Sequence, residues 1–283
     1  MARKYTSISN KLNIIAKTKE NYKIVKAQKE GYLAESAMIA HGRGEAFDYL
    51  LGEKTTFPAK RAMYAAVATI LLSENPVISV NGNTTALAID EVIQFAKTVN
   101  AKIEINLFYR TDERVEKITE LYKKHGYSQI LGTKDDDIKY LKSIKNERAS
   151  ASKTGIYSAD TVLVPLEDGD RAEILSKTGK KTITIDLNPL SRTSQTSDIS
   201  IVDNVVRAFP FMTEIAKDLK TQDKQLLINM INDFDNRKNL KEARVETIAH
   251  KSKALIIQAP PIYMNLPLNP LKIRGFCSPL YTL

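Results

Sequence analysis

Short runs rich in β-branched residues alternate along this chain with longer stretches that have helical spacing, and this alternation constrains the fold more than any other feature. Strands separated by helices in this way predict βαβ units, in which successive strands are parallel and helices cover the sheet. We therefore predict an α/β fold with a Rossmann-like, mostly parallel sheet flanked by helices, and extra helices at both ends. The 283 residues are enough to bury a core without disulfides or metals.

The expected elements can be given by residue range. Predicted strands are Val77 to Val80, Lys102 to Leu107, Gln129 to Leu131, Thr161 to Val164, Thr182 to Ile185 and Ile199 to Val202. Predicted helices are Ala59 to Glu74, Thr84 to Asn100, Asp112 to His125, Arg171 to Thr178, Val205 to Asp218, Asp223 to Asn236 and Asn239 to Leu255, with one or two more within Lys11 to Leu33. The polar stretch Lys145 to Ser158 is expected to be an exposed loop.

Residues 1–259 are expected to form one Rossmann-like domain, because no interior linker rich in Pro, Gly or Ser divides them. Residues 260–283 have no helical or alternating period and contain five of the ten prolines, so we expect an irregular tail.

The charge distribution argues against a nucleic-acid-binding body. The formal net charge is +9, but residues 1–29 alone carry +7 and residues 251–283 carry +4. The residues between them therefore sum to −2, and only the two basic ends are left as arms for a nucleic acid, which we keep as an alternative function.

Several other classes of protein lack support in the sequence. One cysteine, Cys277, excludes a disulfide framework, and no apolar run is long enough for a membrane span, so we expect a cytoplasmic protein. The P-loop, the complete Rossmann fingerprint and the zincin, zinc-ribbon and nucleophile-elbow motifs are absent from the sequence.

Polar residues follow five of the predicted strands. They lie in the segments Asn81 to Thr84, Tyr109 to Arg110, Glu167 to Arg171, Asp186 to Thr193 and Asp203 to Asn204. Because the carboxyl ends of parallel strands form one rim, where open α/β sheets bind ligands, we expect these segments to meet. Each alone is also good turn or cap chemistry, but together their carboxylates, amides and arginines suit a nucleotide with its phosphates and Mg²⁺.

The segment His41 to Glu45 (HGRGE) is the other candidate site. Its two glycines are expected either to expose backbone N–H groups at a helix start and offer Arg43 to an anion, or to form a hinge with an exposed arginine. His41 is a candidate proton shuttle or anion contact, although a lone histidine beside a turn is more often only hydrogen bonded.

These segments, taken together, resemble one enzyme family. The strings are HGRGEAFDYLLGE (His41 to Glu53), PVISVNGN (Pro76 to Asn83), EINLFYRT (Glu104 to Thr111), VPLEDGDR (Val164 to Arg171), ITIDLNPLSR (Ile183 to Arg192) and IVDNVVRA (Ile201 to Ala208). They look like the archaeal phosphopantothenate synthetase (4-phosphopantoate–β-alanine ligase) family over about residues 20 to 255.

The resemblance implies a homodimeric enzyme of coenzyme A biosynthesis that condenses 4-phosphopantoate with β-alanine and cleaves ATP to AMP and diphosphate. The family's ATP contacts carry over to Arg43, Asp186, Leu187, Asn188, Arg192, Thr193, Asn204 and Val205. Another ATP-contacting arginine of the family falls on Asn21, so either Lys19 or Lys23 replaces it or the helix is shifted.

Roles follow from the charge that such a site must collect. Arg43 and Arg192 are the candidate catalytic residues, because they would stabilise charge on the phosphates during formation of an acyl adenylate. By position on the rim, Asn81, Asn83 and Arg110 are assigned to 4-phosphopantoate, and Asp168 and Asp170 to Mg²⁺. A different small-molecule ligase or kinase on the same scaffold stays open as a second alternative.

Overall fold

The computed structural model describes residues 19–141 and 149–258, with side chains up to residue 247. Its centre is a sheet of five strands in the order β2-β1-β5-β6-β7, and all of its pairings are parallel. The strands are β1 (Pro76–Val80), β2 (Lys102–Ile105), β5 (Thr161–Pro165), β6 (Lys181–Ile185) and β7 (Ile199–Ile201). The predicted α/β class and mostly parallel sheet are confirmed.

The strand order reverses direction between β1 and β5. The chain passes from β1 outward to β2 and then returns to pair β5 with the other side of β1, so that Val77 lies between Lys102 and Val162. Loops after the strands on either side of such a reversal diverge and leave a crevice between them. The segments after β1 and β5 therefore border the natural ligand site of this fold.

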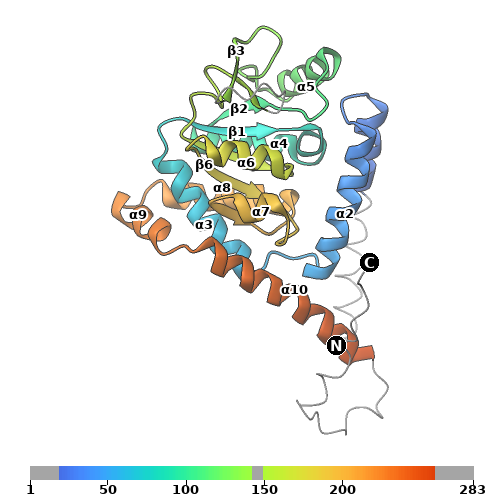
Figure 1. Ribbon diagram of the computed structural model, residues 1–283, viewed down its shortest axis with the longest axis vertical. Coiled ribbons are helices and arrows are strands. Elements are labelled where there is room, and N and C mark those ends of the chain that lie inside the picture. The colour runs from blue at the N-terminus through green and yellow to red at the C-terminus, as the bar shows by residue number, and fades with distance from the viewer. Residues whose placement is uncertain (1–18, 142–148, 259–283) are drawn as a thin grey trace, which may run out of the picture.

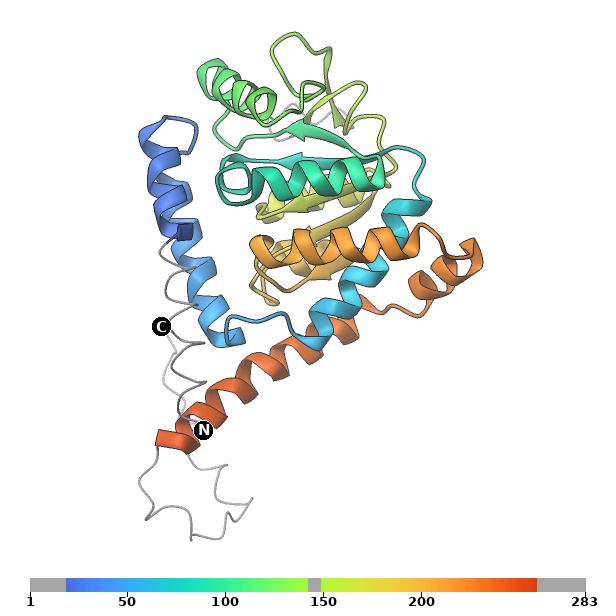
Figure 2. The same ribbon diagram turned by 180° about the vertical axis from the view of Figure 1, so that it is seen from behind.

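Helices cover both faces of the sheet. Figure 2 shows α4 (Gly82–Val99) and α8 (Val205–Leu219) on one face, whereas α6 (Gly169–Lys177) and α7 (Arg192–Thr196) lie on the other face in Figure 1. The remaining helices are a segment at 19–29, α2 (Glu35–Leu51), α3 (Phe57–Leu72), α5 (Asp112–Lys124), α9 (Lys224–Asn232) and α10 (Asn236–Gln258).

The core forms where the strands and helices exclude water. All five residues of β1 and of β5 are buried, which explains why these strands are apolar or β-branched at every position except Ser79. Between sheet and helices, Phe95 of α4 and Phe209 of α8 pack with ring centroids 5.9 Å apart, and both are fully buried. Among the described residues, no helix combines the length and the hydropathy that a bilayer span requires.

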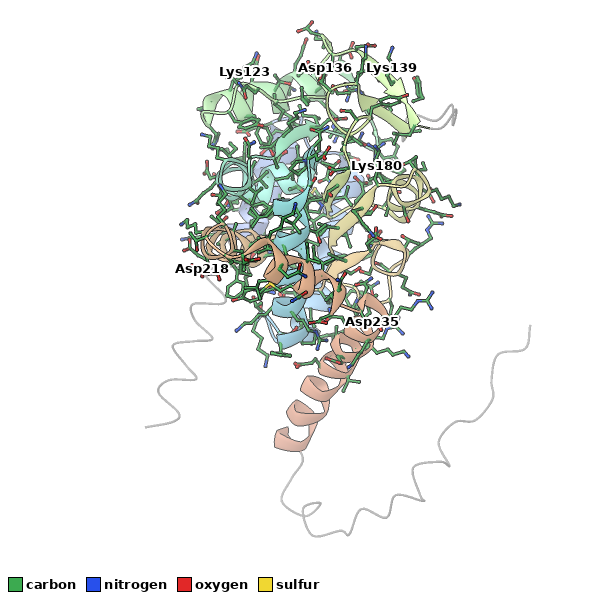
Figure 3. The ribbon with its side chains drawn as sticks, turned by 90° about the vertical axis from the view of Figure 1, so that its left-hand side faces the viewer. Lys123, Asp136, Lys139, Lys180, Asp218 and Asp235 are labelled. Atoms are coloured by element: carbon green, nitrogen blue, oxygen red, sulfur yellow. The ribbon has the colours of Figure 1, made fainter. Side chains whose placement is uncertain are left out.

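Two outer helices extend beyond this body. Figure 1 shows α2 standing beside the sheet, on the side to which β1 points, and α10 projecting away from the body, as it also does in Figure 3. Only two of the 17 residues of α2, Asp48 and Leu51, are buried.

Three sequence predictions of local structure are wrong. Residues 41–44 lie inside α2, so neither a helix start nor a hinge forms at Gly42 and Gly44. The predicted strand at 129–131 is reduced to one bridge, in which Leu131 exchanges backbone hydrogen bonds with Ile103 and Ile105.

The predicted exposed loop at 145–158 contains a buried strand instead. In it, β4 (Ser150–Ser152) pairs antiparallel with β3 (Ile138–Tyr140), and Ile156 is fully buried. Buried carboxylate and guanidinium groups, Glu104 and Arg171, satisfy the backbone there: Glu104 accepts from the N–H groups of Ser152 and Ile156, and Arg171 donates to the Ser150 carbonyl. The predicted proline-rich tail lies outside the described residues.

Candidate active site

A cavity of about 400 Å³ opens at the carboxyl ends of the strands. Its wall includes seven of the eight predicted nucleotide-binding residues, namely Arg43, Asp186, Leu187, Asn188, Arg192, Thr193 and Asn204. Arg43 comes from α2 and the others from segments that follow β6 and β7, more than 140 residues later in the chain. The structure thus brings the Arg43 helix and the rim loops around one space. The eighth residue, Val205, is fully buried in the core and is not part of this wall.

Arg43 reaches the cavity from the middle of a helix. A Cβ on Gly44 would lie 3.6 Å from the Leu187 side chain, and one on Gly42 would have no neighbour within 4 Å. The Gly44 side of α2 thus faces the loop after β6 with room for a methyl group, and α2 exposes no backbone N–H groups here. The anion-binding capacity of this segment rests on the Arg43 side chain.

The loop after β6 is held in shape by its own polar side chains. Asp186 accepts hydrogen bonds from the Ser191 hydroxyl and from the Asn188 N–H at 2.9 Å, and Asn188 Oδ1 accepts from the Leu190 N–H at 2.9 Å. Burial raises the pKa of Asp186, while these hydrogen bonds act in the opposite direction. Asp186 and Asn188 therefore fix the loop as well as facing the cavity.

Arg192 begins α7 and forms an ion pair with Asp170. A Cβ on Gly169 would come within 2.8 Å of the Arg192 Cβ, so glycine is needed at 169 for α6 and α7 to approach this closely. Thr193 also joins the two segments, because its hydroxyl donates to the Glu167 carbonyl at 3.0 Å. The loops after β5 and β6 thus hold each other at the cavity.

Asn204 caps α8, and its side chain is fully engaged with the protein. Its Oδ1 accepts from the Val206 N–H at 3.2 Å. Its Nδ2 donates to Asp48 Oδ2 at 3.1 Å and to Glu20 Oε2 at 3.2 Å. Asn204 therefore connects α8 to α2 and to the helix at 19–29 through hydrogen bonds.

A second cavity of about 350 Å³ adjoins the first. The two share part of their walls, made by Ala40, Arg43, Asn83, Leu166 and Glu167. The second cavity is also lined by Asn81 and Gly82 at the start of α4 and by Phe108, Tyr109 and Arg114 near the start of α5. The space beside the nucleotide candidates thus lies at the crevice between β1 and β5.

The residues predicted for the second substrate are only partly brought together. Asn81 and Asn83 line the second cavity, and Asn81 also caps α4 by accepting from the Thr84 N–H at 3.0 Å. Arg110 lines neither cavity, because its guanidinium donates to the Gly132 carbonyl at 2.7 Å. Arg114 lies in this wall instead, where its guanidinium donates to the Tyr32 and Tyr109 carbonyls and burial lowers its pKa.

The proposed metal ligands already serve the fold. Asp168 caps α6 by accepting from the N–H groups of Asp170 and Arg171, and Asp170 pairs with Arg192. Within residues 19–141 and 149–247, the structure contains no group of three or more His, Cys, Asp and Glu side chains suited to a metal. A magnesium ion here would depend on one or two carboxylates and on phosphate oxygens, which is how proteins commonly bind it.

The position predicted for a further arginine is occupied by a polar pair. Asn21 Oδ1 lies 3.2 Å from His41 Nε2, and His41 lines the first cavity. Lys23 donates to the Leu87 carbonyl at 2.8 Å, next to Ala88, where the backbone of α4 departs from helical geometry. Lys23 is thus held against α4 beside the cavity wall.

Comparison with known proteins agrees with this arrangement. Residues 58–251 match the model of the phosphopantothenate/pantothenate synthetase family. The chain belongs to this family. It is 52% identical over 221 residues to a 4-phosphopantoate–β-alanine ligase of Thermococcus onnurineus, covering 78% of this chain and 84% of the relative.

Other relatives are similar over most of the chain. A 4-phosphopantoate–β-alanine ligase of Methanosarcina mazei is 50% identical over 228 residues, which is 81% of this chain and 89% of the relative. One from Methanospirillum hungatei is 48% identical over 200 residues, which is 69% of this chain and 81% of the relative. The resemblance drawn from the rim segments is confirmed.

Proposed function

We propose that this protein is an ATP-dependent ligase that joins 4-phosphopantoate to β-alanine and forms 4′-phosphopantothenate, AMP and diphosphate. Two findings support the proposal: the relatives compared above are named 4-phosphopantoate–β-alanine ligases, and the rim of the sheet has two adjoining cavities. The observation that carries the proposal is the shared wall, in which Arg43 borders both spaces. A nucleotide in one cavity would have its phosphates next to an acid in the other.

The chemistry requires activation of a carboxylate. In the proposed reaction, a carboxylate oxygen of 4-phosphopantoate attacks the α-phosphorus of ATP, the bond between the α-phosphorus and the bridging oxygen breaks, and diphosphate leaves. The amine of β-alanine then attacks the acyl carbon, AMP leaves with the former carboxylate oxygen, and the amine loses a proton. Positioning and charge stabilisation supply the rate, and we assign no general base.

The residues of the first cavity are assigned to different parts of ATP according to their charge. Arg43 and Arg192 are assigned to the phosphates, because guanidinium groups bind phosphate oxygens bidentately and keep their charge. Asp186 and Asn188 are assigned to the adenosine or ribose, and Asn204 completes the pocket. Leu187 and Thr193 contribute the remaining wall, and Val205 supports it from the core.

Magnesium is proposed as the companion of ATP, where it would neutralise phosphate charge. Asp168 and Asp170 are the carboxylates nearest in sequence to Gly169, which lines the first cavity. Asp170 is already paired with Arg192, so a metal and the arginine would share this carboxylate.

The second cavity is proposed for 4-phosphopantoate. Its wall combines the start of α4, where the helix dipole and backbone N–H groups favour anions, with Arg114. We now place Arg114 where the sequence alone had indicated Arg110. Asn81 and Asn83 keep their predicted place at this substrate.

A homodimer is the proposed assembly. The helix at 19–29, α2 and α10 expose large apolar side chains, including Tyr22, Ile39, Tyr49 and Val245. A second copy of the chain would cover these surfaces, and light scattering after size exclusion is expected to give twice the chain mass of 31.7 kDa. A monomer mass would contradict this part of the proposal.

Isotope transfer tests the proposed chemistry. With ATP, Mg²⁺, β-alanine and 4-phosphopantoate labelled with ¹⁸O in its carboxylate, one labelled oxygen is expected in AMP for each product formed. Label in inorganic phosphate together with ADP would mean acyl-phosphate chemistry and would overturn the adenylate. Pantoate in place of 4-phosphopantoate is expected to abolish most turnover, and equal use of both acids would exclude a phosphate-selective second cavity.

A further inference from the structure

A buried network of charged residues links the two parts of the chain that border the first cavity. Arg207 of α8 forms a two-pronged ion pair with Asp48 of α2, with Nη2 to Oδ1 at 2.6 Å and Nη1 to Oδ2 at 3.1 Å. The same guanidinium also contacts Asp203, with Nε to Oδ1 at 2.9 Å. Both carboxylates are fully buried, and the Arg207 side chain is 24% exposed.

The network extends directly to a residue of the cavity wall. Asp48 Oδ2 accepts from Arg207 and also from Asn204 Nδ2 at 3.1 Å. Asp203 Oδ1 accepts from the backbone N–H of Asn204 at 2.8 Å. Asn204 is thus held through its backbone and its side chain by the two carboxylates that Arg207 joins.

The charged groups of this network stabilise one another. Burial lowers the pKa of Arg207, but its hydrogen bond to Asp48 and the charge of Asp203 outweigh burial and hold the pKa above its ordinary range. Burial raises the pKa of Asp203, and the charge of Arg207 opposes that shift. Each ionised group in this buried network therefore depends on the partner that faces it, and a neutral or shorter substitute leaves a charge without its partner.

Asp48 also matters because few other residues of α2 are buried against the rest of the protein. Asp48 and Leu51 are its only buried residues, and both lie in its last turn. Arg43 precedes Phe47 by four residues on the same helix, so Phe47 lies one turn along on the same face and also borders the first cavity. The position of Arg43 over the cavity therefore depends on how the last turn of α2 is held against α8.

We infer that Asp48 and Arg207 are positioning residues for ATP, which fix the Arg43 face of α2 relative to Asn204 through one bidentate ion pair. They act through Arg43 and Asn204, since neither is part of the cavity wall. Lysine at 207 keeps the charge but cannot form the fork, and asparagine at 48 keeps the shape but loses the charge. Both changes loosen the same link.

The test rests on the proposed function and compares ATP binding in three variants. We expect Asp48→Asn and Arg207→Lys to weaken ATP binding, measured by calorimetry, by about 10- to 100-fold, the loss that follows at metal sites when a group that orients a contacting residue is removed. In ligase turnover the KM for ATP rises while the KM for β-alanine stays within twofold. The loss of ATP affinity in the double variant is expected to be smaller than the product of the two single losses, because both changes break the same Asp48–Arg207 ion pair.

Thr55→Val is the matched control. Thr55 Oγ1 donates to Asp203 Oδ2 at 2.7 Å, so this change removes one contact of the same network and leaves the Asp48–Arg207 ion pair in place. Its thermal midpoint is expected to fall as in the other variants while ATP binding stays within twofold of the wild type. Equal weakening in Thr55→Val, or unchanged binding in Arg207→Lys, would overturn the inference.

Two further outcomes separate the inference from the proposed function. If Asp48→Asn fails to fold, Arg207→Lys decides the question alone. If the wild-type chain binds ATP and forms AMP but the variants behave normally, only the positioning role is wrong. If the wild-type chain does not bind ATP, the proposed function itself is overturned, together with this inference.

Discussion

Glu104 is expected to make the stability of this protein fall as the pH rises through the acidic and neutral range. This β2 side chain is 1% exposed, and its oxygens accept from the Ser152 N–H at 2.9 Å and the Ile156 N–H at 2.6 Å. Burial raises its pKa from 4.5 to about 7, although these hydrogen bonds and the charge of Arg171 lower it in part. The folded protein thus keeps a proton that the unfolded chain has already released.

The sign and size of the effect follow from proton linkage. Between pH 4.5 and about 7 the folded state binds more protons than the unfolded state, so the free energy of unfolding decreases as the pH rises. One pKa unit corresponds to about 1.4 kcal/mol, which gives a loss of about 3 kcal/mol across the whole window. The loss is complete above about pH 7 and absent well below pH 4.5.

Urea unfolding of the wild type and Glu104→Gln at a series of pH values from 5 to 8 measures this loss. Glutamine cannot ionise, so the difference in unfolding free energy between the two proteins should change by about 2.5 kcal/mol over the series, because part of the loss occurs below pH 5. Glu120→Gln, at an exposed position of α5, controls for the loss of a carboxylate as such. A difference that stays constant with pH would show that Glu104 does not titrate as described.

Four further predictions concern the site and the core. Arg43→Ala should lower the rate of AMP formation by about 100-fold or more, as loss of a charge-stabilising donor does, and near-normal turnover would remove Arg43 from the site. Arg114→Ala should raise the KM for 4-phosphopantoate by about tenfold or more with little change for ATP, whereas an equal rise for both would assign Arg114 to neither substrate alone. Gly169→Ala should reduce AMP formation because its methyl group displaces Arg192, and full activity would show that the α6–α7 contact tolerates a side chain. Phe209→Ala should lower the free energy of unfolding by about 3 to 5 kcal/mol in urea titrations, and a loss below about 1 kcal/mol would mean that the core closes around the cavity.

The strands of the central sheet were predictable because burial on both faces favours runs made mostly of apolar or β-branched residues. That preference gives β1, β5 and β6 a recognisable pattern, and their parallel pairing then brings the following loops to one rim. Several residues of that rim are helix caps, which explains why its sequence is also typical of turns. Asn81, Asp168 and Asn204 each cap a helix and also lie at or beside a cavity.

The sequence does not reveal elements that depend on distant partners. Gly42 and Gly44 each disfavour a helix by about 1 kcal/mol, yet α2 continues through them, since its ends are formed by other residues and its last turn is anchored by Asp48 and Leu51. Likewise Ser150 to Ser152 have no apolar pattern, and their burial depends on Glu104 and Arg171.

Side-chain direction also escapes prediction from position alone. Arg110 and Arg114 are four residues apart, but Arg110 donates to the Gly132 carbonyl, whereas Arg114 donates to the Tyr32 and Tyr109 carbonyls at the wall of the second cavity. The choice between them depends on where α5 begins, at Asp112, and on which carbonyl groups lie within reach.

A crystal structure with bound ATP and Mg²⁺ tests the central claim most directly. The account predicts one nucleotide in the first cavity, with its phosphates within hydrogen-bonding distance of both Arg43 and Arg192 and its adenosine against the Asp186 to Asn188 loop. A nucleotide bound elsewhere, or one in this cavity whose phosphates contact neither arginine, would contradict it.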